Sequence, residues 1–267
     1  MTAASSLARP ERVPPEVDLE GIRLHAIDER QCVDLVMSEC SAGRGGWIVT
    51  PNLDQVRRMR RDRALLERYA RAELALADGM PIMWACRLQG TPVRGRVAGS
   101  DLIWSLSRAA AERGLSLFLL GGDPGTAEEA AAELASRFEG LRVVGTMCPQ
   151  PGFEGHAALV EDIAERLATA RPDLVFVALG VPKQEALIER LRPRLPGAWW
   201  MGVGISFSFV AGRVKRAPPW VRRIGLEWAH RLAQEPRRLA RRYLVDGLPF
   251  AAGLIARSTV RGMRTKS

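Results

Sequence analysis

Short runs of apolar residues recur along the chain, and longer stretches with apolar residues at every third or fourth position separate them. This alternation is typical of a parallel β-sheet covered by helices on both faces. The apolar runs occupy residues 21–27, 46–51, 73–78, 115–122, 141–147, 173–180 and 198–205. The helical stretches occupy residues 54–72, 101–113, 126–138, 157–170 and 184–194. The pattern therefore predicts an α/β fold with a doubly wound, mostly parallel sheet.

Composition divides the 267 residues into three parts. Residues 1–18 are rich in Pro, Ser and charge, and we expect them to be disordered. Residues 19–211 hold the alternating runs and are expected to form the α/β core. Residues 212–267 contain 14 Lys and Arg but only three acids, a local balance of +11, whereas the whole chain has a formal charge of +9. An anionic partner is therefore expected at this basic appendage.

The appendage has the pattern of a surface helix. Trp220, Ile224 and Trp228 recur at every fourth position before Pro236 interrupts the pattern. Amphipathic, Arg-rich helices that carry Trp lie on anionic membrane surfaces. No apolar run reaches the roughly 20 residues needed to cross a bilayer. The first residues also lack the apolar core of a secretory signal, so we expect a cytoplasmic protein.

No metal or cofactor site is indicated. The four cysteines and three histidines are scattered, and no Asp-x-Asp pair occurs. The glycine-rich loop at residues 121–125 lacks both the full dinucleotide-binding pattern and a phosphate-binding lysine. These absences weaken a nicotinamide-dependent oxidoreductase as an alternative.

Several polar residues follow apolar runs, where ligands bind in a doubly wound sheet. Asp78 ends the run 73–78 and is a candidate general base, although Asp-Gly is also a common turn. Thr50 and Asn52 end the run 46–51, and both could instead cap the next helix. Gln184 could donate to a sugar hydroxyl or satisfy local backbone.

Several blocks of sequence stand in a distinctive order: TPNLDQV at residues 50–56, ADGMPIMWACRLQG at 77–90, RVAGSDL at 96–102, ALGVPKQE at 178–185 and an Arg-rich stretch at 212–243. In order and spacing they are similar to the WecG/TagA/CpsF family of bacterial glycosyltransferases. The resemblance covers roughly residues 20–245. It implies a Rossmann-like core and a C-terminal appendage that completes the active site and touches the inner face of the plasma membrane.

The resemblance also implies an inverting, metal-independent transfer from a UDP-sugar donor to a polyprenyl-diphosphate-linked sugar. N-acetylmannosamine is the typical sugar transferred, and glucose for exopolysaccharide is the alternative. The resemblance assigns the base to Asp78 and substrate contacts to Thr50, Asn52, Arg96 and Gln184. It assigns the diphosphate contacts to Arg231, Arg238 and either Arg241 or Arg242, because the register of residues 237–242 is ambiguous by one position.

A carboxylate with an ordinary pKa near 4 would be a modest base, so we expect proton transfer to occur late in the reaction. The alternative from another class is a nucleic-acid-binding protein whose basic appendage contacts phosphates. That alternative leaves Asp78 and Gln184 without a role, and the tryptophans have helical rather than base-stacking spacing. We therefore expect no nucleic-acid partner. The sequence leaves open the particular UDP-sugar and whether the active form is a monomer or a homo-oligomer.

Overall fold

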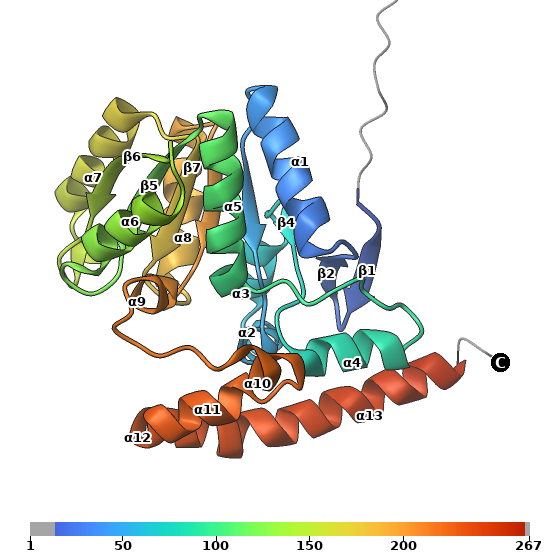
Figure 1. Ribbon diagram of the computed structural model, residues 1–267. Coiled ribbons are helices and arrows are strands. Elements are labelled where there is room, and N and C mark those ends of the chain that lie inside the picture. Colours follow the sequence, from blue (N-terminus) through green and yellow to red (C-terminus); the bar gives the residue numbers. More distant parts are fainter. Residues whose placement is uncertain (1–13, 265–267) are drawn as a thin grey trace, which may run out of the picture.

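A six-stranded parallel sheet forms the centre of the protein (Figure 1). The computed structural model describes residues 14–264, apart from the side chains of Pro219 and Arg223. The strand order is β4–β3–β8–β7–β5–β6, and every neighbouring pair is parallel. The bounds are Gly46–Val49 (β3), Leu74–Ala75 (β4), Ser116–Gly121 (β5), Arg142–Met147 (β6), Leu174–Ala178 (β7) and Trp199–Gly202 (β8). The predicted Rossmann-like α/β fold is confirmed.

Helices cover both faces of the sheet because alternate strand side chains point to opposite faces. In β5, Phe118 and Leu120 belong to one buried cluster, and Leu117 and Leu119 belong to the other. One cluster packs under α1 (Glu29–Ser41), α5 (Gly99–Arg113), α6 (Thr126–Arg137) and α9 (Ser206–Val210). The other packs under α2 (Leu53–Met59), α3 (Arg63–Tyr69), α7 (Ala157–Ala170) and α8 (Lys183–Leu191).

The N-terminal part of the described chain corrects two expectations. The first apolar run does not enter the parallel sheet, because β1 (Glu16–Leu19) and β2 (Ile22–His25) form a separate antiparallel pair. Glu20 and Gly21 have positive φ angles of 58° and 84°, the backbone geometry of a tight two-residue hairpin turn. The expected disorder of residues 1–18 is therefore wrong for 16–18, and residues 1–13 lie outside the described part.

The stretch 54–72 also differs from expectation, since it forms two helices rather than one. The side chain of Asp62 accepts a hydrogen bond from the backbone N–H of Leu65 at 3.1 Å and caps the start of α3. A cap inside an amphipathic pattern begins a new helix without breaking the apolar periodicity. The stretch 184–194 contains α8 and then a short 3₁₀ turn, Arg192–Arg194.

The appendage lies across one end of the sheet as a chain of short helices followed by a long one (Figure 1). Their bounds are Pro219–Arg223 (α10), Glu227–Gln234 (α11), Pro236–Ala240 (α12), a π-helical segment Arg241–Gly247 (η3) and Leu248–Arg264 (α13). Helix α13 packs along α4 (Met80–Leu88), and its Leu254 is fully buried. Within residues 14–264, no helix has the length and apolar character of a membrane span.

Candidate functional site

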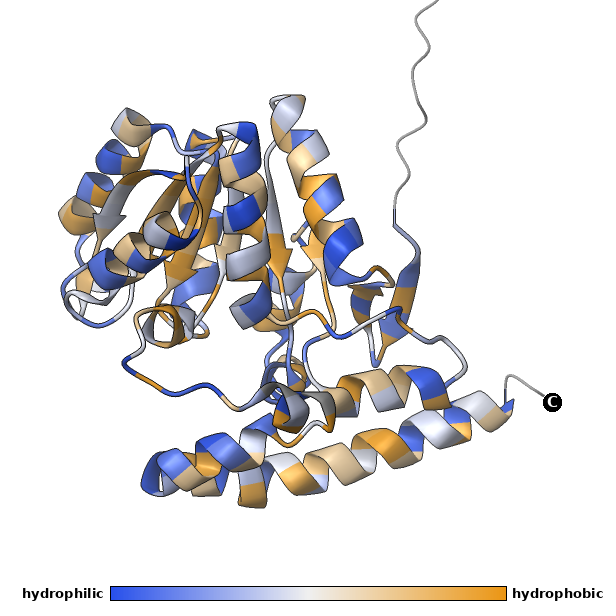
Figure 2. Ribbon diagram, viewed as in Figure 1, coloured by the Kyte–Doolittle hydropathy of each residue, from blue (hydrophilic) through white to orange (hydrophobic). Residues whose placement is uncertain are grey.

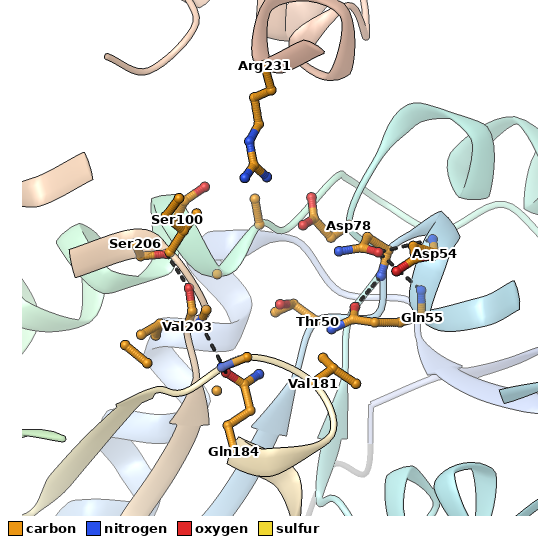
Figure 3. A pocket seen from close by; sticks show the side chains of 18 of the residues that line it. Thr50, Asp54, Gln55, Asp78, Ser100, Val181, Gln184, Val203, Ser206 and Arg231 are labelled. Atoms are coloured by element: carbon orange, nitrogen blue, oxygen red, sulfur yellow. Dashed lines mark hydrogen bonds between the residues drawn. The ribbon is translucent and has the colours of Figure 1, made fainter. Parts of the chain in front are cut away.

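A cavity of about 990 Å³ lies between the sheet and the appendage. Loops that follow all six parallel strands line its core side, and they contribute Thr50, Asp78, Gly122, Gly152, Gly180 and Gly204. The appendage lines the opposite side with residues from α10 through α13. Figure 3 shows Arg231 reaching from the appendage into the cavity above Thr50 and Asp78, with Gln184 at its floor. The cavity therefore occupies the carboxyl edge of the sheet, where doubly wound folds bind ligands.

Asp78 is held at this edge by an extension of the β3–β4 pairing. The backbone N–H of Leu76 donates to the carbonyl of Val49 at 2.9 Å, and that of Asp78 donates to the carbonyl of Pro51 at 3.1 Å. Gly79 follows with φ 105°, a conformation that only glycine adopts readily, and α4 begins at the next residue. The strand extension and the abrupt turn place the Asp78 carboxylate in the cavity lining.

The environment of Asp78 changes its expected chemistry. Only 24% of its side chain is exposed, and burial raises the pKa of its carboxyl to about 7. The Arg96 guanidinium, 3.6 Å away, opposes this rise in pKa, whereas Glu227 and Asp101 add to it. The expectation of a modest base with a pKa near 4 is therefore corrected. A group with a pKa near 7 is a stronger base that is half ionised at neutral pH.

Thr50 and Asn52 both line the cavity, after the end of β3. The side-chain oxygen of Asn52 caps α2 by accepting from the backbone N–H groups of Asp54 at 3.1 Å and Gln55 at 3.2 Å. The Gln55 side chain in turn accepts from the backbone N–H of Asn52 at 2.7 Å. The capping alternative is confirmed for Asn52. Because the cap engages its oxygen, the amide nitrogen is the atom that could serve a ligand.

Gln184 joins two of the loops that line the cavity. Its side-chain oxygen accepts from the backbone N–H groups of Gly180 and Gly204, each at 3.2 Å, and its amide nitrogen donates to Glu185 at 2.9 Å. Glu185 also accepts from the Tyr69 hydroxyl at 3.0 Å, and burial raises the pKa of its carboxyl. The alternative that Gln184 satisfies local backbone is confirmed. Gln184 fixes the loops after β7 and β8 and still contributes to the cavity wall.

Arg96 lies in the cavity wall beside three carboxylates. Its guanidinium is 3.6 Å from Asp78, 3.0 Å from Asp101 and 3.4 Å from Glu227. Asp101 lies in the first turn of α5, whereas Glu227 is the first residue of α11 in the appendage. Arg96 therefore ties the appendage to the core next to the candidate base.

The arginines expected at a diphosphate have different surroundings. Arg231, Arg238 and Arg242 line the cavity, whereas Arg241 is exposed and lies outside the lining. Arg238 pairs with Glu235, and Arg242 is 3.1 Å from Asp54. Within the described part of the chain, Arg231 has no carboxylate within ion-pair distance.

The structure places Arg242, rather than Arg241, in the cavity lining together with Arg238. Arg242 follows Arg238 by four positions, the spacing that puts two side chains on one face of a helix. Arg231 lies on a separate helical piece from Arg238 and Arg242, because Glu235 leaves the helical conformation with φ −131° before Pro236. One continuous arginine face on a single helix is therefore not formed.

Sequence reasoning named none of the residues that join Arg96 across the interface. Asp101 accepts hydrogen bonds from Arg216 at 2.7 Å and from Arg222 at 2.8 Å, and Arg222 also lines the cavity. These partners are more than 100 positions apart along the chain, so no local pattern pairs them. The one available signal was that Glu227 is among only three acids in a strongly basic segment.

A metal site does not emerge from the described residues, in which no three His, Cys, Asp or Glu side chains are grouped so that they could hold a metal ion. Asp78, Asp101 and Glu227 instead face guanidinium groups. Metal independence stays a prediction for experiment.

Comparison with known proteins gives consistent matches. The model of the glycosyl transferase WecG/TagA/CpsF family matches residues 17–264. A Bacillus spizizenii (strain W23) protein named N-acetylglucosaminyldiphosphoundecaprenol N-acetyl-beta-D-mannosaminyltransferase is 33% identical over 201 residues, 74% of this chain and 75% of that protein. A Bacillus subtilis (strain 168) protein of the same name is 33% identical over 181 residues, 68% of each chain. The family match includes both the core and the appendage.

Proposed function

Because the chain belongs to the WecG/TagA/CpsF family of glycosyltransferases, we propose that it transfers an N-acetylmannosamine-type sugar from a UDP donor to N-acetylglucosamine on a polyprenyl diphosphate. The names of both Bacillus relatives specify this sugar and this acceptor, which supports the proposal. The observation that carries it is that one cavity presents Asp78 from the core and Arg231 from the appendage. An acid and a cation on opposite walls suit transfer from a charged leaving group.

Asp78 serves the acceptor side of this reaction. The acceptor hydroxyl oxygen attacks C1 of the donor sugar as the bond from C1 to the UDP oxygen breaks, and the hydroxyl proton passes to the Asp78 carboxylate. A single in-line displacement of this kind inverts the configuration at C1. General-base catalysis works best when the pKa of the base is near the operating pH. A carboxyl with a pKa of about 7 is therefore well suited to accept the proton at neutral pH.

Arg231 serves the leaving-group side. UDP leaves with its negative charge on the diphosphate, and a positioned guanidinium stabilises that charge as it develops. Arg231 is available for this role because no carboxylate lies within ion-pair distance of it in residues 14–264. This arrangement supplies positive charge without requiring a metal ion.

The surface next to the cavity supports a peripheral position on the inner face of the plasma membrane. Helices α4, α10 and η3 carry exposed apolar side chains, among them Trp84, Trp220 and Val245, which are 47%, 64% and 65% exposed. Figure 2 shows apolar and polar residues interleaved along α4 and α13. Apolar side chains among basic ones favour binding to anionic lipid. A lipid-linked acceptor would then reach the cavity from the bilayer surface.

Sedimentation with phosphatidylglycerol vesicles tests this membrane position. The double variant W220S/V245S should bind the vesicles several-fold more weakly than the unmodified protein. Leu159→Ser is the matched control, because Leu159 is also exposed but lies on α7, away from the appendage. Equal vesicle binding by all three proteins would contradict the membrane position.

The substrate proposal is tested with the full-length protein and a short-chain polyprenyl-diphosphate N-acetylglucosamine acceptor. A panel of UDP-sugars is supplied one at a time, mass spectrometry detects the product, and NMR identifies the anomer. UDP-N-acetylmannosamine should give an inverted product. Transfer from UDP-glucose alone would favour the exopolysaccharide alternative, and no transfer from any UDP-sugar would refute the proposed function.

A further inference from the structure

Six charged side chains meet where the appendage contacts the core. We call them the charge cluster: Asp78, Arg96 and Asp101 from the core, and Arg216, Arg222 and Glu227 from the appendage. Each is between 16% and 24% exposed. Three acids and three guanidinium groups give the charge cluster no net charge. Because little water separates these groups, a change in the charge of one strongly affects the others.

Within the charge cluster, two carboxylates share one nitrogen of Arg96. The Nη1 atom is 3.6 Å from Asp78 Oδ1 and 3.4 Å from Glu227 Oε2, while Nη2 is 3.0 Å from Asp101. Arg96 therefore stabilises the ionised form of Asp78 only in part. Glu227 accepts a hydrogen bond from the same Nη1 group, and its charge also repels negative charge on Asp78. A neutral group in place of Glu227 would leave more of Arg96 to Asp78.

Two links hold Glu227 in the charge cluster. It is the first residue of α11, and Arg216 Nε lies 3.5 Å from its Oε1. Arg216 and Arg222 both bond to Asp101, which fixes this end of the appendage on α5. The geometry thus brings Glu227 to Arg96 only when the appendage is seated on the core.

We propose that Glu227 is a positioning residue through which the seated appendage makes Asp78 a stronger base. The charged groups that face Asp78 are Arg96, Asp101, Glu227 and Arg216. Of the two acids, Asp101 lies on the core and Glu227 on the appendage. Arg216, also on the appendage, lowers the pKa of Asp78, but its effect is smaller than that of Glu227. The same seating brings Arg231 to the cavity, so base and leaving-group contact would be established together. The catalytic consequence rests on the proposed function, but the effect on Asp78 does not.

The test is a carbon-13 NMR titration of the Asp78 carboxyl in the full-length protein, with the signal identified by its absence in Asp78→Asn. In Glu227→Gln the titration midpoint should fall by roughly 1 pH unit, the lower end of the effect of a nearby charge. The acid limb of kcat/KM should move by the same amount. Glu227→Asp, which keeps the charge, should titrate closer to the unmodified protein.

Asp246→Asn is the matched control, since Asp246 is also an acid of the appendage and also contacts the core, 3.6 Å from Arg57. Its titration midpoint should match that of the unmodified protein. An unchanged midpoint in Glu227→Gln, or an equal shift in Asp246→Asn, would overturn the inference. Lost transfer in Glu227→Gln with an unmoved midpoint would make Glu227 purely structural and would also overturn it. If the unmodified protein transferred no sugar, the proposed function would fail while the titration would still decide this inference.

Discussion

Replacing Asp78 by Asn should lower sugar transfer and raise stability in the same protein. The carboxylate is buried in the cavity wall, and burial raises its pKa from 3.8 to about 7. An acid whose pKa is higher in the folded state than in the unfolded state disfavours folding when it is ionised. This cost is absent below about pH 4 and fully present above about pH 7, and an amide of the same size removes it.

The size of the effect follows from the shift in pKa. A rise from 3.8 to about 7 is roughly three pKa units, and each unit corresponds to about 1.4 kcal/mol, so the gain above pH 7 is at most about 4 kcal/mol. The substitution does not leave Arg96 without an acidic partner, because its ion pairs with Asp101 at 3.0 Å and Glu227 at 3.4 Å remain. Transfer should fall by about 10² to 10⁴, the usual contribution of a general base.

Urea unfolding of both proteins at pH 4 and pH 8 measures the stability term, and the transfer assay measures the catalytic term. The two unfolding free energies should coincide at pH 4, and Asp78→Asn should be the more stable protein at pH 8. In the unmodified protein, kcat/KM should rise about tenfold per pH unit until it levels near pH 7. A less stable Asn variant at pH 8, or one with full transfer activity, would refute the reasoning.

Three further outcomes are expected. Removing residues 212–267 should leave a core that is still folded by circular dichroism. In the described chain, all buried members of the two apolar clusters except Leu254 come from residues before 212. Sugar transfer should be lost, because the deletion also removes Arg231. EDTA should change the transfer rate less than twofold, and an inhibition that magnesium reverses would reveal a metal site. Gly202→Ala should slow transfer by about 10² and also lower the melting temperature, because its Cβ would lie 2.4 Å from the Gln184 amide nitrogen and displace a buried amide that joins the loops after β7 and β8.

The sheet could be predicted from the sequence because most of its strands, though not the edge strand β6, are buried on both faces. The runs at 115–122 and 173–180 contain the fully buried strands β5 and β7, and a continuous apolar run bounded by glycine is a strong local signal. The position of Asp78 at the edge of the sheet could be predicted for the same reason, since Asp78 is the last residue of the run 73–78. The sequence pattern did not predict the hairpin of β1 and β2. Residues Ile22–His25 resemble the apolar runs of the parallel sheet, and their partner strand β1 lies in a charged segment.

The details of the site depend on contacts that local patterns do not encode. The pKa of Asp78 reflects its burial and also the charge of Glu227, which lies more than 100 residues away along the chain. The selection of Arg242 over Arg241 depends on how the appendage is placed against the core, which the local pattern of arginines does not encode. Arg216, Arg222 and Glu227 lie inside a block that was recognised for its arginines, yet only the fold shows that they meet Arg96 and Asp101.

The division of labour between Asp78 and Arg231 is tested most directly by calorimetric titration of UDP into the full-length protein and three variants. Asp78→Asn should bind UDP within about twofold of the unmodified protein, because the base acts on the acceptor. Arg231→Ala should bind about 10- to 100-fold more weakly, since a hydrogen bond to a charged group contributes about 1.5–3 kcal/mol. Arg241→Ala, the exposed control, should bind normally. Unchanged binding by Arg231→Ala, or an equal loss in Asp78→Asn, would contradict the assignment of the two groups to opposite sides of one reaction.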